Sequence, residues 1–454
     1  MRHHSPTVTI NRLAQQQTIS VIVPVYNSAD TLKLCVERLL RSSTPAFECI
    51  VVDDGSTDDS ASVARACGTR VLSTTGRQGP AAARNLGATQ ASGEILFFLD
   101  ADVCVNGDTI ARVQAAFESD PTLDALIGSY DDSPSSKDFL SQYKNLMHSF
   151  VHQTGRREAS TFWSGCGAIR RELFLRHSGF DEAYGRPAIE DIELGYRLRS
   201  AHRKIVLDPD LQVTHLKCWT FLGLLKSDVL DRGIPWTELI LRDQHMPNDL
   251  NLQLSQRVSV ALAYVLLGFA TACAILWRGY FLTPLFAALF FLVGRYWLDG
   301  GGDRSWTVFL SLTLSSMTVV GLAYKENMLG LIPAVVLGYA VLFVRHRYAK
   351  PIETEWPWTR YLLGIIVALC LLFILSYLPG HPLILAFFVV LASMVILNNQ
   401  FYVFLAAKRG HLFAVAAVPF HLLYHLYNGL SFALGLCRFT AHSFFARAKQ
   451  LFAR

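Results

Sequence analysis

The sequence predicts an α/β domain with a mostly parallel sheet, followed by an all-α transmembrane bundle. Over the first half of the chain, short apolar runs such as 95–99 alternate with amphipathic stretches such as 32–40, which is the signature of βαβ units. The chain is also 52% hydrophobic and only 17% charged, and its apolar excess lies almost entirely after about residue 258. A net charge of +5 is modest for 454 residues and gives no case for nucleic acid binding.

The stretch 94–103 is apolar until it ends in Asp100 and Asp102, one residue apart. Five large apolar residues in a row indicate a strand that is buried on both faces. Side chains alternate along a strand, so the two carboxylates point the same way, at the sheet edge where α/β proteins bind ligands. A divalent cation that also holds a diphosphate would explain them, and a turn with a helix cap is the alternative.

Two further strands are expected to end at the same edge. The run 20–27 contains Pro24 and Tyr26, and the run 49–52 leads directly into Asp53 and Asp54. These side chains are placed to read a base and ribose, although Asp-Asp-Gly-Ser could equally form a turn and cap a helix. Arg84 follows a glycine-containing loop at the head of a helix, where a cation suits a diphosphate and small residues also suit close packing.

Four segments in this order resemble the motifs of family 2 glycosyltransferases with the GT-A fold: 20–27, 51–58, 79–88 and 98–102. The resemblance covers roughly residues 19–215. It implies a Rossmann-like, mixed but mostly parallel sheet, a nucleotide-diphospho-sugar donor, Mg²⁺ or Mn²⁺ at the Asp-x-Asp motif, and inversion at the anomeric carbon.

The resemblance also implies roles for individual residues. The donor site would comprise Pro24, Tyr26, Asp53, Asp54, Arg84, Asp100 and Gly165. Asp100 and Asp102 would hold the metal, and His215 would be a third ligand, as in some GT-A enzymes. A purely structural role for this lone histidine is the alternative.

The acceptor side is expected at Glu190 and Asp191, which begin a helical stretch. In the family this pair carries the catalytic base, so Asp191 is assigned as the base and Glu190 as its supporting neighbour, with helix capping as the alternative. Glu193 and Arg197 have the spacing of an ion pair along a helix. A base favours a hydroxyl acceptor over a lipid phosphate, which is already an anion.

The predicted layout has a polar lead at 1–18, the catalytic domain at 19–218, interfacial or linker helices at 219–254 and a membrane domain at 255–454. Six spans are expected, at about 258–277, 280–298, 306–324, 328–344, 361–378 and 383–407, with a re-entrant or interfacial segment near 412–436. Charged loops and the lack of an apolar leader favour a catalytic domain in the cytosol, at a bacterial inner membrane. Nine scattered cysteines favour free thiols.

The sequence therefore predicts a membrane-anchored inverting glycosyltransferase that uses a hydroxyl on a lipid-linked or membrane-proximal acceptor. A polyprenyl-phosphate glycosyltransferase and a lipid exporter with a nucleotide-sugar-binding domain are the alternatives. A motif of processive polysaccharide synthases, Gln-x-x-Arg-Trp, is absent after Gln212, which argues against a polymerase.

Overall fold

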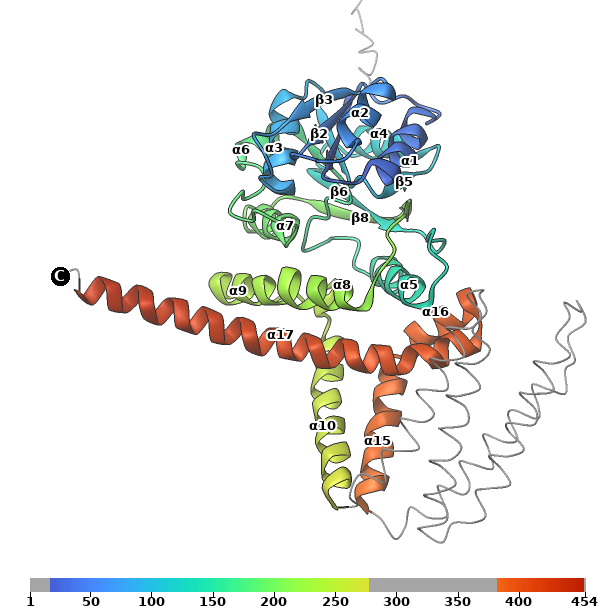
Figure 1. The fold of residues 1–454 in the computed structure, drawn as a ribbon, viewed down its shortest axis with the longest axis vertical. Helices are drawn as coiled ribbons and strands as arrows, with labels where there is room; N and C mark the ends of the chain where they lie inside the picture. Colours follow the sequence, from blue (N-terminus) through green and yellow to red (C-terminus); the bar gives the residue numbers. More distant parts are fainter. Residues whose placement is uncertain (1–16, 277–381, 453–454) are drawn as a thin grey trace, which may run out of the picture. The chain divides into compact units, whose positions relative to one another are not determined.

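The computed structural model describes residues 17–276 and 382–452 (Figure 1). The chain divides into two compact units. The first comprises Met1–Gln253 and Leu430–Arg454, and the second comprises Leu254–Gly429. The spans predicted between 280 and 378 lie outside the described residues.

An eight-stranded mixed sheet forms the centre of the first unit, in the order β3-β2-β1-β4-β7-β6-β8-β5. Its first four strands are parallel to one another, β7 is antiparallel to both of its neighbours, and β6 and β8 are parallel. This confirms the predicted α/β class with a mixed sheet. The strands are β1 (Ile19–Val25), β2 (Glu48–Asp53), β3 (Arg70–Ser73), β4 (Ile95–Leu99), β5 (Val103–Val105), β6 (Ala125–Tyr130), β7 (Cys166–Arg170) and β8 (Ile205–His215).

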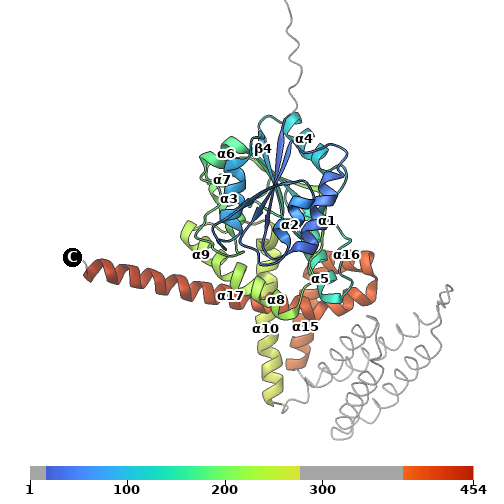
Figure 2. The same ribbon diagram turned by 45° about the horizontal axis from the view of Figure 1, so that its top comes forward.

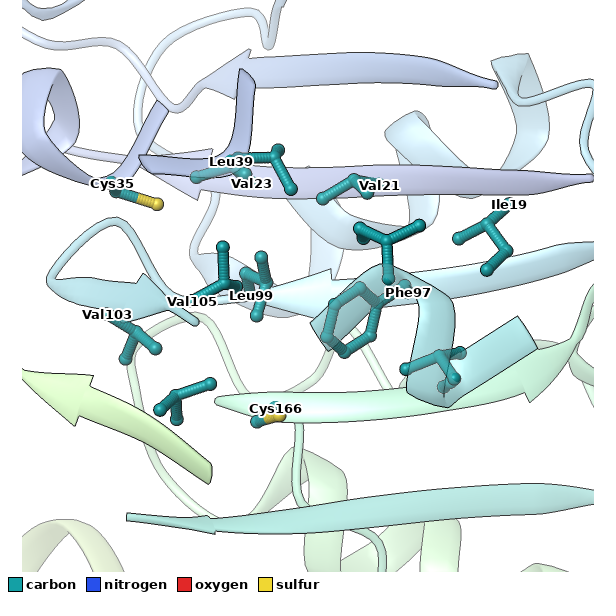
Figure 3. Close-up of a cluster of buried hydrophobic side chains, with 14 of the residues drawn as sticks. Ile19, Val21, Val23, Cys35, Leu39, Phe97, Leu99, Val103, Val105 and Cys166 are labelled. Carbon is teal, nitrogen blue, oxygen red and sulfur yellow. The ribbon is translucent and has the colours of Figure 1, made fainter. Parts of the chain in front are cut away.

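Helices cover both faces of the sheet (Figure 2). One apolar layer joins the sheet to α1 (Ala29–Leu40), α2 (Ser60–Ala66) and α4 (Thr109–Ser119), and it includes Cys35, Phe97 and Cys166 (Figure 3). The opposite layer packs on α3 (Pro80–Gln90), α6 (Arg171–Arg176) and α7 (Glu190–Ser200). All five residues of β4 are buried, as its apolar run predicted.

Strand β8 runs without a break through Pro209, although proline usually lies outside the centre of a sheet. Its pairing with β6 shifts register between Ile127, opposite Leu207, and Ser129, opposite Gln212. Pro209 therefore lies in a bulge, where the missing N–H of proline costs no ladder hydrogen bond.

The first unit continues after the sheet with α5 (Phe139–Gln153), which precedes β7 in the chain, and with α8 (Phe221–Leu225), the π-helix η1 (Lys226–Gly233), α9 (Ile234–Asp243) and the short 3₁₀-helix η2 (Leu250–Leu252). Helices were expected in 219–242, although a π-helix was not. A buried ion pair ties α5 to η1, since Lys144 Nζ lies 2.7 Å from Asp228 Oδ2. The end of α17 joins this unit through Arg438, whose Nε lies 3.1 Å from Glu238 Oε1.

The second unit contains α10 (Leu254–Leu276), α15 (Pro382–Leu397), α16 (Asn399–Arg409) and the first part of α17 (His411–Phe452). In the described part of the chain, Leu254–Ala272 is one helix long and apolar enough to cross a membrane. The span predicted at 383–407 is not one straight helix, because α15 and α16 meet at an angle of 67°. Asn398 at the break is buried and donates to Ser259 Oγ and to the Met394 carbonyl. Helix α17 covers the segment that was expected near 412–436.

Candidate active site

A cavity of about 910 Å³ opens at the carboxyl ends of β1, β2 and β4. Parallel strands end at the same edge, so the residues that follow each strand meet there. Eight of the residues predicted for the site line the cavity: Pro24, Tyr26, Asp54, Arg84, Asp100, Asp102, Glu190 and Asp191. Asp53, Gly165 and His215 do not line the cavity. Asp53 and Gly165 are adjacent in sequence to Asp54 and Ser164, which do line it, and His215 contacts Asp102.

Arg84 connects the donor-side and acceptor-side acids of this cavity. Its Nη2 donates to Asp100 Oδ1 at 2.7 Å, and its Nη1 donates to Glu190 Oε1 at 2.9 Å. The guanidinium is 5% exposed, and its Nε has no hydrogen-bond partner among the described residues. Burial lowers the pKa of Arg84, but the charges of Asp100, Glu190 and Asp191 outweigh this and raise it. A buried, permanently charged cation therefore lies between the two groups of carboxylates.

Asp102 and His215 are brought together by sheet register. Val103 of β5 pairs with His215 of β8, and the Leu216 amide donates to the Asp102 carbonyl at 2.8 Å. His215 Nε2 consequently lies 3.6 Å from Asp102 Oδ2. The other ring nitrogen, Nδ1, lies 2.6 Å from Asn145 Oδ1, and this contact fixes the orientation of the imidazole ring.

This pair fits a divalent cation in its chemistry. A carboxylate and a neutral imidazole with its second nitrogen fixed by a hydrogen bond are a usual ligand set. Asp100 is engaged with Arg84, and among the described residues no three His, Cys, Asp or Glu side chains form a ready metal cluster. Burial raises the pKa of Asp102, but the hydrogen bond and charge of His215, together with Lys217, lower it overall. The carboxylate is thereby kept ionised.

Asp191 is held in a fixed orientation at the start of α7. Its Oδ2 accepts from the amide of Ser164 at 3.0 Å and from the Ser164 hydroxyl at 3.1 Å, and its Oδ1 accepts from the Ile192 amide. The adjacent Glu190 accepts from Arg84 and from the Ala188 amide. Burial raises the pKa of Glu190, with Asp191 adding to the effect and Arg84 opposing it.

Asp53 and Asp54 shape the loops at the nucleotide end of the cavity. Asp54 accepts from the backbone amides of Gln78 and Gly79, each at 2.8 Å. Asp53 accepts from the Ser56 amide, which is the turn that the sequence analysis gave as the alternative to nucleotide binding. The hydrogen bonds of Asp54 fix the loop that begins α3, and therefore the position of Arg84 behind it.

Two glycines permit close contacts beside the cavity. Gly79 has φ of +98°, and a Cβ built on it would lie 2.6 Å from the carbonyl carbon of Gly185. Only glycine allows both this backbone conformation and this approach. A Cβ on Gly165 would lie 2.8 Å from the indole of Trp163, so Gly165 lets this ring, which lines the cavity, fold over the chain.

Several cavity residues were missed by the sequence reasoning. Arg77 lies over the ring of Tyr26, with 4.1 Å from its Cζ to the ring centroid, and Lys217, Lys226 and Arg232 add positive charge to the wall. Helix α5 contributes His148 and His152 to the wall, and Asn145 on the same helix contacts His215. The signal was present, because these residues recur at i, i+3 and i+7, which places them on one helix face.

The arrangement combines a cavity, two sets of carboxylates and a buried cation. Asp102 and His215 can hold a cation at one side, where a diphosphate would be bound. Asp191, oriented by Ser164, can accept a proton at the other side. Arg77 and Tyr26 offer a flat cationic and aromatic surface at the nucleotide end.

Comparison with known proteins gives one family match and several similar sequences. Residues 20–177 match the family model "Glycosyl transferase family 2". Glycosyltransferase GlyG of Streptococcus pneumoniae is 38% identical over 120 residues, 25% of this chain and 39% of GlyG. Glycosyltransferase AglE of Haloferax volcanii is 41% identical over 91 residues, 18% of this chain and 30% of AglE. The chain thus spans less than half of the length of these two relatives.

Among solved structures, the chain is similar to the mannosyltransferase PcManGT from Pyrobaculum calidifontis in complex with GDP-Man and Mn²⁺. The two are 17% identical with a TM-score of 0.37, over 85% of this chain and 86% of that one. The segment matched by the family model contains all four predicted motifs. Residues 20–177 are therefore the part of the chain that is similar to glycosyl transferase family 2.

Proposed function

We propose that this protein is a membrane-anchored inverting glycosyltransferase. It moves one sugar from a nucleotide-diphospho-sugar to a hydroxyl of a lipid-linked or membrane-proximal acceptor, with its catalytic domain in the cytosol. The observation that supports this most directly is the single cavity in which Asp100 and Asp102 face Glu190 and Asp191 across Arg84. Direct transfer requires the leaving diphosphate and the base to be held in one site.

The chain's own groups suit the two halves of such a transfer. Asp191 removes the proton of the acceptor hydroxyl, and its two hydrogen bonds from Ser164 keep the carboxylate aimed. Arg84 offers a buried positive charge next to Asp100, where negative charge collects as the nucleoside diphosphate leaves. Glu190 positions Arg84 and touches no reacting atom in this scheme.

Asp102 and His215 would hold Mg²⁺ or Mn²⁺, with Asp100 beside them. When bound, such an ion neutralises charge on the leaving diphosphate. His215 contributes because its contact with Asn145 through Nδ1 orients the ring with Nε2 towards Asp102.

Membrane anchoring is supported by the apolar helix at Leu254–Ala272, which follows the catalytic unit directly. Its length matches the roughly 20 residues needed to cross the hydrocarbon layer. We expect the full chain to remain in the membrane pellet after extraction with alkaline carbonate. Release of the intact protein into the supernatant would contradict anchoring.

The central test is substitution of the two acids to which the scheme gives separate roles. Asp102→Asn and Asp191→Asn keep side-chain size and remove the negative charge. Asp191→Asn is expected to lower the rate of sugar transfer by about 10²- to 10⁴-fold, the usual value of a positioned acid–base group. Asp102→Asn is expected to lower it as well, because it removes a proposed metal ligand. The measurement is turnover with Mn²⁺ on the purified full chain, with circular dichroism as the control for folding. Wild-type turnover in either variant would overturn the mechanism.

A polyprenyl phosphate is the second candidate acceptor, and one observation favours it. Lys217, Lys226 and Arg232 line the cavity in addition to Arg84, so an anionic acceptor would find counter-charges there. Such an acceptor needs no base. Transfer to a polyprenyl phosphate that survives Asp191→Asn would establish this candidate, whereas loss of transfer in that variant supports the hydroxyl acceptor.

A further inference from the structure

We propose that Arg232 and Trp236, on the cavity wall, bind an acceptor sugar that carries a phosphate, with Arg232 holding the phosphate and Trp236 contacting the sugar. This inference rests on the proposed function and names the class of its acceptor, a glycosyl phosphate or diphosphate that is either lipid-linked or free. A hydroxyl of the sugar is the nucleophile, and the phosphate only positions it. Both residues lie beyond residue 177, where the family match ends.

One face of the helical stretch α8–η1–α9 lines the cavity. Four residues of this face follow one another at intervals of four or five: Gly223, Ser227, Arg232 and Trp236. The interval of five lies inside the π-helix η1, whose turns are closed by i→i+5 hydrogen bonds, so residues five apart share a face there. An α-helix has 3.6 residues per turn and would rotate the fifth residue away. The π-helix, which the sequence did not predict, therefore keeps Arg232 in line with Trp236 on the wall.

Trp236 is held beside the predicted base. Its Nε1 donates to the hydroxyl of Tyr196 at 3.2 Å, and Tyr196 belongs to α7, the helix whose first turn contains Asp191. The side chain packs on the cluster of Ile189 and Tyr196, yet it is partly exposed and lines the cavity together with Asp191. Because the indole N–H is already bonded, the ring offers a ligand apolar surface, which suits the C–H side of a sugar.

Arg232 is a partly buried cation that lacks a counter-charge. Within the described part of the chain it forms no ion pair or hydrogen bond. Both acids of η1 are engaged elsewhere, since Asp228 accepts from Lys144 at 2.7 and 2.8 Å, and Asp231 Oδ1 lies 3.5 Å from Arg186 Nε. A guanidinium in this state suits an anion with several acceptor oxygens, such as a phosphate.

A second cation strengthens the positive charge near Arg232. Burial lowers the pKa of Lys144, and Arg232 and Lys217 lower it further, whereas Asp228 raises it. The charges of Arg232 and Lys217 therefore act on the same place. Lys217 is exposed on the cavity wall, where its Nζ lies 4.2 Å from the ring centroid of Trp219. An anion bound at Arg232 would be attracted by both cations.

The pairing of an unpaired cation with an indole favours one class of acceptor. A bare lipid phosphate has no sugar for Trp236, and a neutral glycolipid has no anion for Arg232. A sugar bonded to a phosphate matches both, because residues four apart on a helix face have Cβ atoms about 5–6 Å apart, close to the spacing of a sugar ring and its phosphate. The sugar then lies at the Asp191 end of the row, where a proton has to be removed.

The test replaces each residue in two ways. Arg232→Gln removes the charge, and the KM for the acceptor should rise about 10- to 100-fold, the value of a hydrogen bond to a charged group, with a smaller rise in Arg232→Lys. Trp236→Leu removes the ring, and the rise should be about 3- to 10-fold, with a smaller one in Trp236→Phe. The KM for the donor should not change in any of them.

Two controls separate contact from structure. Leu239→Ala loosens the cluster on which Trp236 packs and lies off the cavity wall. Arg176→Gln removes a surface cation that pairs with Glu172 on α6. Neither should raise the KM for the acceptor by more than about twofold.

The assay gives the purified full chain Mn²⁺, a lipid extract and a water-soluble extract of the producing cells, and follows products by mass spectrometry. Mild acid cleaves a glycosyl phosphate bond, so the product should release a glycan of two or more sugars. Product in the organic phase identifies a lipid-linked acceptor, and product in water identifies a free sugar phosphate.

Mild acid also supplies the acceptor glycan without its phosphate. The wild type should use the intact acceptor about 10- to 100-fold better than this free glycan. Arg232→Gln should lose that preference, whereas Trp236→Leu should keep it, because only Arg232 contacts the phosphate.

Several results overturn the inference. Release of a single sugar by mild acid means that the phosphate itself was glycosylated, and a product that resists mild acid has no such linkage. A rise of the donor KM in Arg232→Gln places the cation at the donor diphosphate, and an equal effect of Leu239→Ala and Trp236→Leu makes Trp236 a packing residue. A wild-type protein that transfers no sugar from these extracts refutes the proposed function itself, so the two failures are separable.

Discussion

Arg84 is the residue through which the two acidic groups of the cavity are joined. Its guanidinium is almost fully buried and holds Asp100 and Glu190 at hydrogen-bond distance. A planar guanidinium can bond in two directions at once, which a lysine ammonium on a flexible stem does not reproduce. Arg84 therefore has a structural role that is separable from any contact with a diphosphate.

The first prediction at this scale concerns that role. Arg84→Met leaves the buried carboxylate of Glu190 without its cation, and we expect a loss of about 3 kcal/mol in the free energy of unfolding. Arg84→Lys should lose less, because a positive charge remains. Urea unfolding followed by tryptophan fluorescence measures both. Equal stability of Arg84→Met and the wild type would show that the bridge does not stabilise the fold.

His152 gives a prediction for pH dependence. Its pKa is about 4 in the folded protein, against 6.5 when exposed, so between these values the unfolded chain binds a proton that the folded chain does not. Stability supplied by the neutral ring is complete above pH 6.5 and is lost as the pH falls towards 4. At pH 5 this amounts to about 2 kcal/mol, at 1.36 kcal/mol per pH unit.

Denaturation at pH 7 and pH 5 checks this in paired samples. The wild type should lose about 2 kcal/mol more than His152→Phe on acidification. Parallel losses in the two proteins would mean that another group dominates this pH range.

At the scale of elements, prediction succeeded where a pattern is local. The run Ile95–Leu99 is apolar on both faces, and the strand that it predicted is wholly buried. The stretch that begins at Glu190 forms α7, and Glu193 bonds Arg197 within it, as their spacing indicated. Asp100 and Asp102 reached the cavity because the end of a parallel strand fixes where the next residues lie.

Prediction failed where distant segments decide the local structure. Proline disfavours a strand interior, but pairing with β6 continues β8 through Pro209 in a bulge. Asn398 interrupts an apolar run through its bond to Ser259, a partner 139 residues away. The imidazoles of α5 were overlooked because only the packing of Trp163 and Tyr130 turns that helix face into a cavity wall. No single-segment pattern contains these contacts.

The link between α5 and the π-helix η1 gives the element-scale prediction. Lys144 and Asp228 form a buried ion pair, and removal of one partner leaves the other charge without compensation. Lys144→Met or Asp228→Leu alone should cost about 3–5 kcal/mol in the free energy of unfolding, and the double variant should regain most of it. The double-mutant cycle is measured in urea. Additive losses would contradict a direct pairing.

At the scale of the whole molecule, the chain combines a segment similar to glycosyl transferase family 2 with helices that follow later in the sequence and form a second compact unit. The family match ends at residue 177. Asp191, His215 and the cations Lys217 and Arg232 all come later in the chain, and each lines the cavity or contacts a residue that does. The predicted base Asp191 and the predicted metal ligand His215 therefore lie outside the matched segment.

The position of β8 between β6 and β5 has a consequence for how the protein is made. Both neighbours are synthesised before β8. The side-chain amide of Asn106 can donate to the carbonyl of Gln212 only after that residue, 106 positions later, has been synthesised. Until then β5 and β6 present open edges, which in a nascent chain invite pairing with other molecules. Synthesis therefore has to proceed past residue 215 before Asp102 can contact His215. A fragment that ends at residue 177 is expected to aggregate rather than fold.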